Sequence, residues 1–201
     1  MILIKNSILN FFKDYKLICT YIENSCGIDF NTMLQVMVLC AEDRRFIKHR
    51  GVSIKSIFRA IIKRHGGAST INMQLVRTLT NRREITIVRK IREIALSIFI
   101  DIKFNKIDIL NAYLENAYFG KNIHGVNEVL NKFFGKKDSY DISQYQCCII
   151  ASMLKRPYSC NKEEWAFKIN KRVSYVISIY HTNEKSLSKE IESLKLKYKK
   201  Q

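Results

Sequence analysis

The stretch AEDRRFIKHRG, residues 41 to 51, places an acid pair, a histidine and a glycine directly after an apolar run from Met33 to Ala41. The apolar run predicts a buried helix that carries Glu42 at its C-terminal end. A carboxyl group among apolar residues has its charged form disfavoured, which suits a general acid or base, whereas neighbouring arginines act in the opposite direction. Taken alone, the stretch is also compatible with a solvated helix end that carries local salt bridges.

The rest of the chain indicates one mainly helical domain. Its 201 residues are 47% hydrophobic and include one proline, so the chain can bury a core and has few breaks. Apolar residues at helical spacing predict helices at 52–64, from 71 onward, at 86–100, at 108–119 and at 141–154. The segment at 86–100 has an isoleucine stripe opposite a charged face, and this face is either solvated or binds a ligand. The stripe is Ile87, Ile91, Ile94 and Ile98, and the charged face is Arg89, Lys90 and Glu93.

The net charge of the chain indicates which kinds of partner it could bind. The 35 basic residues exceed the 18 acidic ones and give a formal charge of +17, which attracts phosphate on nucleic acid, anionic lipid or a diphosphate. No helix-turn-helix, zinc-finger or aromatic RNA-binding pattern is present, so a nucleic-acid-binding protein is an alternative that we do not favour. The six cysteines form no CxxC pair and are expected to pack as small hydrophobic residues rather than to bind zinc or form disulfides.

The two ends of the chain are expected to lie outside the central domain. Residues 1–30 form an amphipathic segment or a degenerate anchor, because charged residues interrupt every apolar run well before the roughly 20 residues of a membrane span. We find no clear transmembrane anchor or signal peptide in the sequence. An interfacial helix and a helix docked on the domain both fit this segment. Residues 181–201 read as a basic amphipathic tail.

Four further stretches follow residues 41–51 in a recognisable order, and together they resemble the peptidoglycan glycosyltransferases, the family 51 transglycosylase domain of penicillin-binding proteins. The resemblance covers about residues 31–180 and implies a lysozyme-like, two-lobed helical domain. The stretches are GGASTINMQLVR (66–77), RKIRE (89–93), ILNAYLENAYFG (109–120) and the weaker KRPYSCN (155–161).

The resemblance implies a reaction in which a sugar hydroxyl attacks an anomeric carbon that carries a polyprenyl diphosphate, so that lipid II is polymerised into glycan strands. Glu42 matches the general base of the family. Glu93 matches its second glutamate, which orients the diphosphate-binding cations. No tightly bound cofactor is implied, although the family allows a divalent cation, Mg²⁺ or Mn²⁺, near Glu93. The positions that match substrate-binding or supporting residues are Asp43, Phe46, His49, Ser69, Thr70, Gln74, Arg77, Arg89 and Lys90.

The same resemblance implies a monofunctional enzyme at the outer face of the bacterial cytoplasmic membrane. Its expected partners are lipid II, the nascent glycan strand, the anionic membrane surface and proteins of cell-wall synthesis.

Departures from the family pattern keep two other functions open. Met73 stands where a second glutamine is usual before Gln74, and Ile85 replaces a phosphate-contacting arginine. A degenerate, non-catalytic lipid II binder is therefore one alternative. A lysozyme-like glycan hydrolase is another, but hydrolysis needs a second carboxylate rather than a row of cations.

Overall fold

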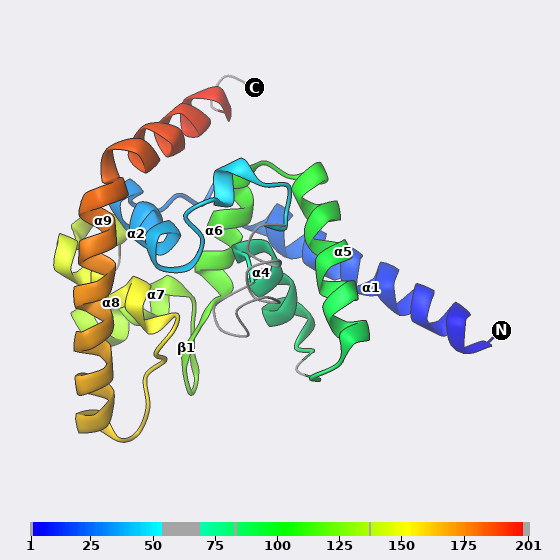
Figure 1. Cartoon of the computed structure of the whole chain (residues 1–201), viewed down its shortest axis with the longest axis horizontal. Coiled ribbons are helices and arrows are strands. Elements are labelled where there is room, and N and C mark those ends of the chain that lie inside the picture. Colours follow the sequence, from blue (N-terminus) through cyan, green and yellow to red (C-terminus); the bar gives the residue numbers. More distant parts are fainter. Residues whose placement is uncertain (1, 54–68, 83, 137, 199–201) are drawn as a thin grey trace. The chain divides into compact units, whose positions relative to one another are not determined.

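The computed structural model describes residues 2–53, 69–82, 84–136 and 138–198, and Figure 1 shows their course. Helices predominate, so the expected mainly α, lysozyme-like fold class is confirmed. The elements are α1 (Ile2–Asn24), α2 (Thr32–Glu42), η1 (Phe46–Lys48), α4 (Ile71–Thr80), α5 (Ile87–Lys103), α6 (Lys106–Asn116), β1 (Tyr118–Gly120), β2 (Ile123–His124), α7 (Gly125–Val129), η2 (Leu130–Phe134), η3 (Ser139–Asp141), α8 (Gln144–Met153) and α9 (Lys162–Tyr198).

The chain divides into two compact units, and each unit is discontinuous in sequence. The first unit contains the chain up to Gly27 and the part from Lys48 to Tyr113. The second contains Ile28–Ile47 and everything from Leu114 onward. The domain boundaries expected at residues 30 and 180 stay predictions.

In the first unit, α1 packs on α4 and α5. Ile18 and Ile22 of α1 are fully buried, and Asp14 on the same helix forms ion pairs with Arg82 at 2.8 Å and with Arg92 at 2.7 Å. The side chains of Thr70 and Thr86 accept hydrogen bonds from backbone N–H groups in the first turns of α4 and α5, which satisfies donors that a helix start leaves open. No helix among the described residues is both long and apolar enough to cross a membrane.

The orientation of α5 differs from the expected one. Ile87 is 80% exposed and Ile91 is 61% exposed, and the isoleucine stripe is not the buried face. The buried face includes three polar side chains that have partners inside the unit: Glu93 pairs with Arg89 and Lys90, Ser97 donates to the Glu93 carbonyl, and Asp101 pairs with Lys106. The periodicity of the sequence distinguishes the two faces of this helix but does not show which one is buried. In the structure the face that includes Glu93 is buried, and its polar side chains have polar partners. The buried residues of α5 are Glu93, Leu96, Ser97, Ile100 and Asp101.

The second unit is built on α2, which packs against α8 and α9. Seven residues of α2, from Leu34 to Cys40, are buried, and the Asn31 side chain caps its start. In α8 the Ser143 and Gln146 side chains form a reciprocal capping box. The helix α9 continues without a break past residue 181 to Tyr198.

Several predicted boundaries were wrong. The helix expected at 108–119 ends at Asn116, and Tyr118–Gly120 instead pairs as an antiparallel strand with β2. The helix expected from residue 141 begins at Gln144, because Ser143 supplies the cap. Most of the helix expected at 52–64 lies outside the described residues. The cysteine prediction was partly wrong, since Cys26 and Cys160 are exposed, whereas Cys19, Cys40, Cys147 and Cys148 are buried.

Candidate functional site

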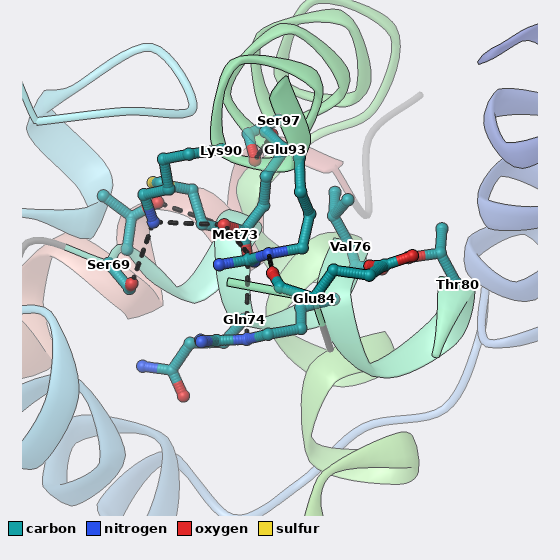
Figure 2. A network of polar contacts seen from close by, with 12 residues as sticks. Ser69, Met73, Gln74, Val76, Thr80, Glu84, Lys90, Glu93 and Ser97 are labelled. Carbon is teal, nitrogen blue, oxygen red and sulfur yellow. Dashed lines mark hydrogen bonds and ion pairs between the residues drawn. The ribbon is translucent and has the colours of Figure 1, made fainter. Parts of the chain in front are cut away.

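The most distinctive polar cluster of the first unit surrounds Glu93, whose side chain is 2% exposed (Figure 2). Its Oε2 accepts hydrogen bonds from Lys90 Nζ at 3.0 Å and from Arg89 Nη1 at 3.1 Å. Its Oε1 lies 3.5 Å from Arg77 Nε, which comes from α4. The cluster therefore holds three cations on one carboxylate and keeps an excess of positive charge.

The cations of this cluster remain partly open to solvent. The side chains of Arg77 and Lys90 are 40% and 33% exposed, whereas that of Arg89 is 17% exposed. Lys90 Nζ also donates to Ser69 Oγ at 3.3 Å, just before α4 begins. The carboxylate thus acts as a buried anchor that aligns cations whose outer sides can meet an anion.

A small cavity of about 10 Å³ lies beside the cluster and is just large enough for about one water molecule. Gln74 belongs to the same helix as Arg77, and its Oε1 accepts a hydrogen bond of 2.8 Å from the Tyr113 hydroxyl. The residues that line the cavity are Val76, Arg77, Thr80, Arg82, Arg89, Arg92, Glu93 and Leu96.

The predicted base, Glu42, belongs to the second unit, where it is the last residue of α2. Its side chain is 10% exposed, and its Oε1 lies 3.5 Å from Nη2 of Arg172 on α9. Asp43 follows as the helix C-cap and accepts a backbone hydrogen bond of 3.0 Å from Phe46, whose ring is 1% exposed. Asp43 and Phe46 therefore fix the turn that follows Glu42.

The stretch 41–51 is shared between the two units, and His49 and Gly51 belong to the first. The His49 carbonyl accepts a hydrogen bond of 2.7 Å from Lys106, which also pairs with Asp101. Gly51 has φ +71°, and its carbonyl accepts a hydrogen bond of 2.7 Å from the Thr70 hydroxyl. Thr70 thus ties the end of this stretch to the start of α4.

The described residues show whether side chains that could bind the expected divalent cation lie together. Among the described parts of the chain, no group of three or more His, Cys, Asp or Glu side chains could hold a metal ion. Both oxygens of Glu93 face cations rather than a space suited to a metal. These residues do not fit a resident metal ion.

Arg172 is the site residue that sequence reasoning missed. It lies 131 residues after Ala41, whose carbonyl accepts a hydrogen bond of 2.7 Å from its Nη2. A weak signal was present in the sequence, because Arg172 stands beside the apolar positions Ile169, Val173 and Val176 that form the buried side of α9.

Comparisons with known proteins agree with this helical arrangement. A family model described as "Transglycosylase" matches residues 27–181. Penicillin-binding protein 2a of Streptococcus pneumoniae serotype 2 (strain D39 / NCTC 7466) is 38% identical over 140 residues, which are 69% of this chain and 19% of that protein. Penicillin-binding protein 1A of Rickettsia bellii (strain RML369-C) is 32% identical over 155 residues, which are 73% of this chain and 20% of that protein.

A third relative, penicillin-binding protein 1B of Haemophilus influenzae (strain ATCC 51907 / DSM 11121 / KW20 / Rd), is 37% identical over 130 residues, which are 60% of this chain and 16% of that protein. The chain thus spans about a fifth of the length of these curated relatives. Because the family match covers most of the sequence, the resemblance found in its motifs is confirmed. The chain belongs to the transglycosylase family.

Proposed function

We propose that the chain is a peptidoglycan glycosyltransferase that polymerises lipid II into glycan strands. In this reaction the sugar hydroxyl of one substrate attacks the anomeric carbon of another. The new C–O bond forms as the bond to the polyprenyl diphosphate breaks. Glu42 accepts the proton of the hydroxyl, which is a poor nucleophile near neutral pH without a positioned base.

The single observation that carries this proposal is the cationic cluster on Glu93. A leaving diphosphate gains negative charge, and preorganised cations stabilise that charge in the transition state. Arg77 and Lys90 are held by a buried carboxylate and still expose 40% and 33% of their side chains. A glycan hydrolase would need a second carboxylate instead of this cluster, so the observation favours glycosyl transfer from a diphosphate.

The remaining predicted site residues have supporting roles in this proposal. Ser69 fixes the position of Lys90, Thr70 caps α4, and Gln74 is oriented by Tyr113. Asp43 and Phe46 hold the turn after Glu42, and His49 contributes its backbone carbonyl to Lys106. A divalent cation would enter with the diphosphate substrate, a prediction that polymerisation with and without EDTA tests.

The decisive experiment compares the wild-type chain with Glu42→Gln and Glu93→Gln on lipid II in detergent. Glu163→Gln is the matched control, because Glu163 is an exposed carboxylate in the first turn of α9. We expect polymer from the wild type and the control, and none from Glu42→Gln. Full activity of Glu42→Gln would refute its role as the base. Lipid II binding without polymer from the wild type would identify a non-catalytic binder.

The cationic cluster is tested by binding. Arg89→Ala and Lys90→Ala should each weaken lipid II binding roughly 10- to 100-fold, because a hydrogen bond to a charged group contributes about 1.5–3 kcal/mol. The loss should shrink at high salt. Lys103→Ala removes a cation from the last turn of the same helix and should leave binding unchanged. Equal binding by all three variants would contradict a diphosphate site at Glu93.

A further inference from the structure

The C-terminal end of α2 carries negative charge, which Arg172 of α9 compensates. Glu42 is the last residue of α2, where the helix dipole is negative and the final carbonyl groups have no partner within the helix. A carboxylate at this position is disfavoured unless a cation compensates it. Nη2 of Arg172 donates to the Ala41 carbonyl at 2.7 Å and lies 3.5 Å from Glu42 Oε1. One guanidinium thus meets both the helix end and the carboxylate.

We propose that Arg172 is a positioning residue for Glu42, which holds the carboxylate in place and in its charged form before substrate arrives. The inference rests on the proposed role of Glu42 as the base. It assigns no contact between Arg172 and the reacting atoms. Arg172 acts only through Glu42, whose side chain it restrains from outside α2.

Arg172 is itself held in a fixed place. Its guanidinium lies over the ring of Tyr175, at 4.7 Å from the ring centroid, and its side chain is 19% exposed. Val173 and Val176 on the same helix are buried, so packing of α9 on α2 sets its register. The remaining exposed part of Arg172 lines a groove of about 360 Å³ together with Tyr175 and other residues, whereas the Glu42 Oε1 that it faces is buried.

An arginine suits this position better than a lysine does. The planar guanidinium can donate to a carbonyl and face a carboxylate while it stacks on an aromatic ring. A lysine would supply one point charge on a flexible stem, without the same stacking. The conservative variant Arg172→Lys should therefore restore the charge without fully restoring the orientation of Glu42.

Other charged groups also lie near this end of α2. Asp43 and Arg44 follow Glu42 in the chain, and they bring one charge of each sign. Glu184 on α9 and Arg44 act electrostatically on Cys40, which stands two residues before Glu42 in α2. Arg172 contacts the Glu42 carboxylate from another helix.

The test measures lipid II polymerisation against pH for the wild type, Arg172→Gln and Arg172→Lys. A nearby cation favours the ionised carboxylate, so its loss should move the acid limb of kcat upward by about one pH unit. On that limb, kcat of Arg172→Gln should fall roughly tenfold with little change in KM, and it should recover at higher pH. Arg172→Lys should keep the wild-type limb with a lower kcat. Lys171→Gln removes the exposed neighbouring charge on α9 and should keep the wild-type profile.

A second measurement separates this inference from the proposed function. The carboxyl carbon of Glu42 is followed by ¹³C NMR during a pH titration, with Glu42→Gln used to assign the signal. The midpoint should rise by about one pH unit in Arg172→Gln. An unchanged midpoint, or a lowered kcat with an unmoved acid limb, overturns the role of Arg172. Absence of polymer from the wild type overturns the proposed function instead, and NMR then still decides whether Arg172 holds the charge of Glu42.

Discussion

Replacement of Gly51 by alanine should destabilise the first unit through a collision that the structure locates. A Cβ atom on Gly51 would lie 2.2 Å from the Ser97 carbonyl oxygen, 2.6 Å from its carbonyl carbon and 2.9 Å from the Ile98 nitrogen. All three atoms belong to the backbone of α5, so no side chain can rotate away. The φ of +71° adds strain for any residue with a Cβ atom.

The expected loss has two parts. A left-handed conformation costs an alanine about 1–2 kcal/mol. Overpacking against a fixed backbone costs about 1–3 kcal/mol more. Gly135 is the matched control, because its φ is +59° and a Cβ there would meet nothing within 4 Å. Gly135→Ala should therefore show the first loss without the second.

Thermal unfolding followed by circular dichroism at 222 nm measures the difference. At about 2–4 °C per kcal/mol for a chain of this size, Gly51→Ala should melt roughly 2–12 °C below Gly135→Ala. Gly125→Ala is a second test, since its Cβ would lie 2.2 Å from the Glu115 carbonyl oxygen. Equal losses at Gly51 and Gly135 would refute the argument from close approach and leave only backbone strain.

Three further predictions concern ion pairs and thiols. Asp14→Asn should lower the free energy of unfolding by about 1–3 kcal/mol in urea titrations, because it leaves two partly buried arginines without their carboxylate. Glu23→Gln, which removes the carboxylate of an exposed ion pair, should change the free energy of unfolding much less. Burial raises the pKa of Cys147 from 9.0 to about 12, so the folded state favours the neutral thiol. That stabilisation is complete below the pKa of the thiol in the unfolded chain and is lost as pH rises toward its pKa in the folded chain. In Cys147→Ala the urea midpoint should therefore decrease less steeply at alkaline pH. Iodoacetamide at mildly alkaline pH should label exposed Cys160 first and Cys26 more slowly, because burial raises the pKa of the Cys26 thiol. Mass spectrometry identifies the labelled residues, and labelling of Cys147 before unfolding would contradict its burial.

Local chemistry made part of this fold predictable. Asn31 and Thr70 cap helices because a short polar side chain can reach the open N–H groups of the next turn, and both are recognisable in the sequence. The apolar run that leads into Glu42 likewise predicted a buried helix with the glutamate at its end. Each of these inferences needs only neighbours within a few residues.

Other features could not be predicted from the sequence, because they depend on contacts between distant segments. The buried face of α5 has partners outside that helix, because Arg77 pairs with Glu93 and Ser69 accepts a hydrogen bond from Lys90. Arg172 meets the end of α2 across more than a hundred residues, and no spacing rule connects the two. The prediction located the charged residues, whereas their pairing required the three-dimensional arrangement.

The packing of α2 against α8 and α9 also has a consequence for synthesis of the chain. The helix α2 ends at Glu42, and its partner α8 begins at Gln144, about a hundred residues later. A ribosome that adds about 5–20 residues per second makes that interval in roughly 5–20 s. During this time the seven residues of α2 that end up buried have no partner helix to cover them. Chaperone binding to nascent chains should therefore be strongest after α2 emerges and should fall once α9 has been made.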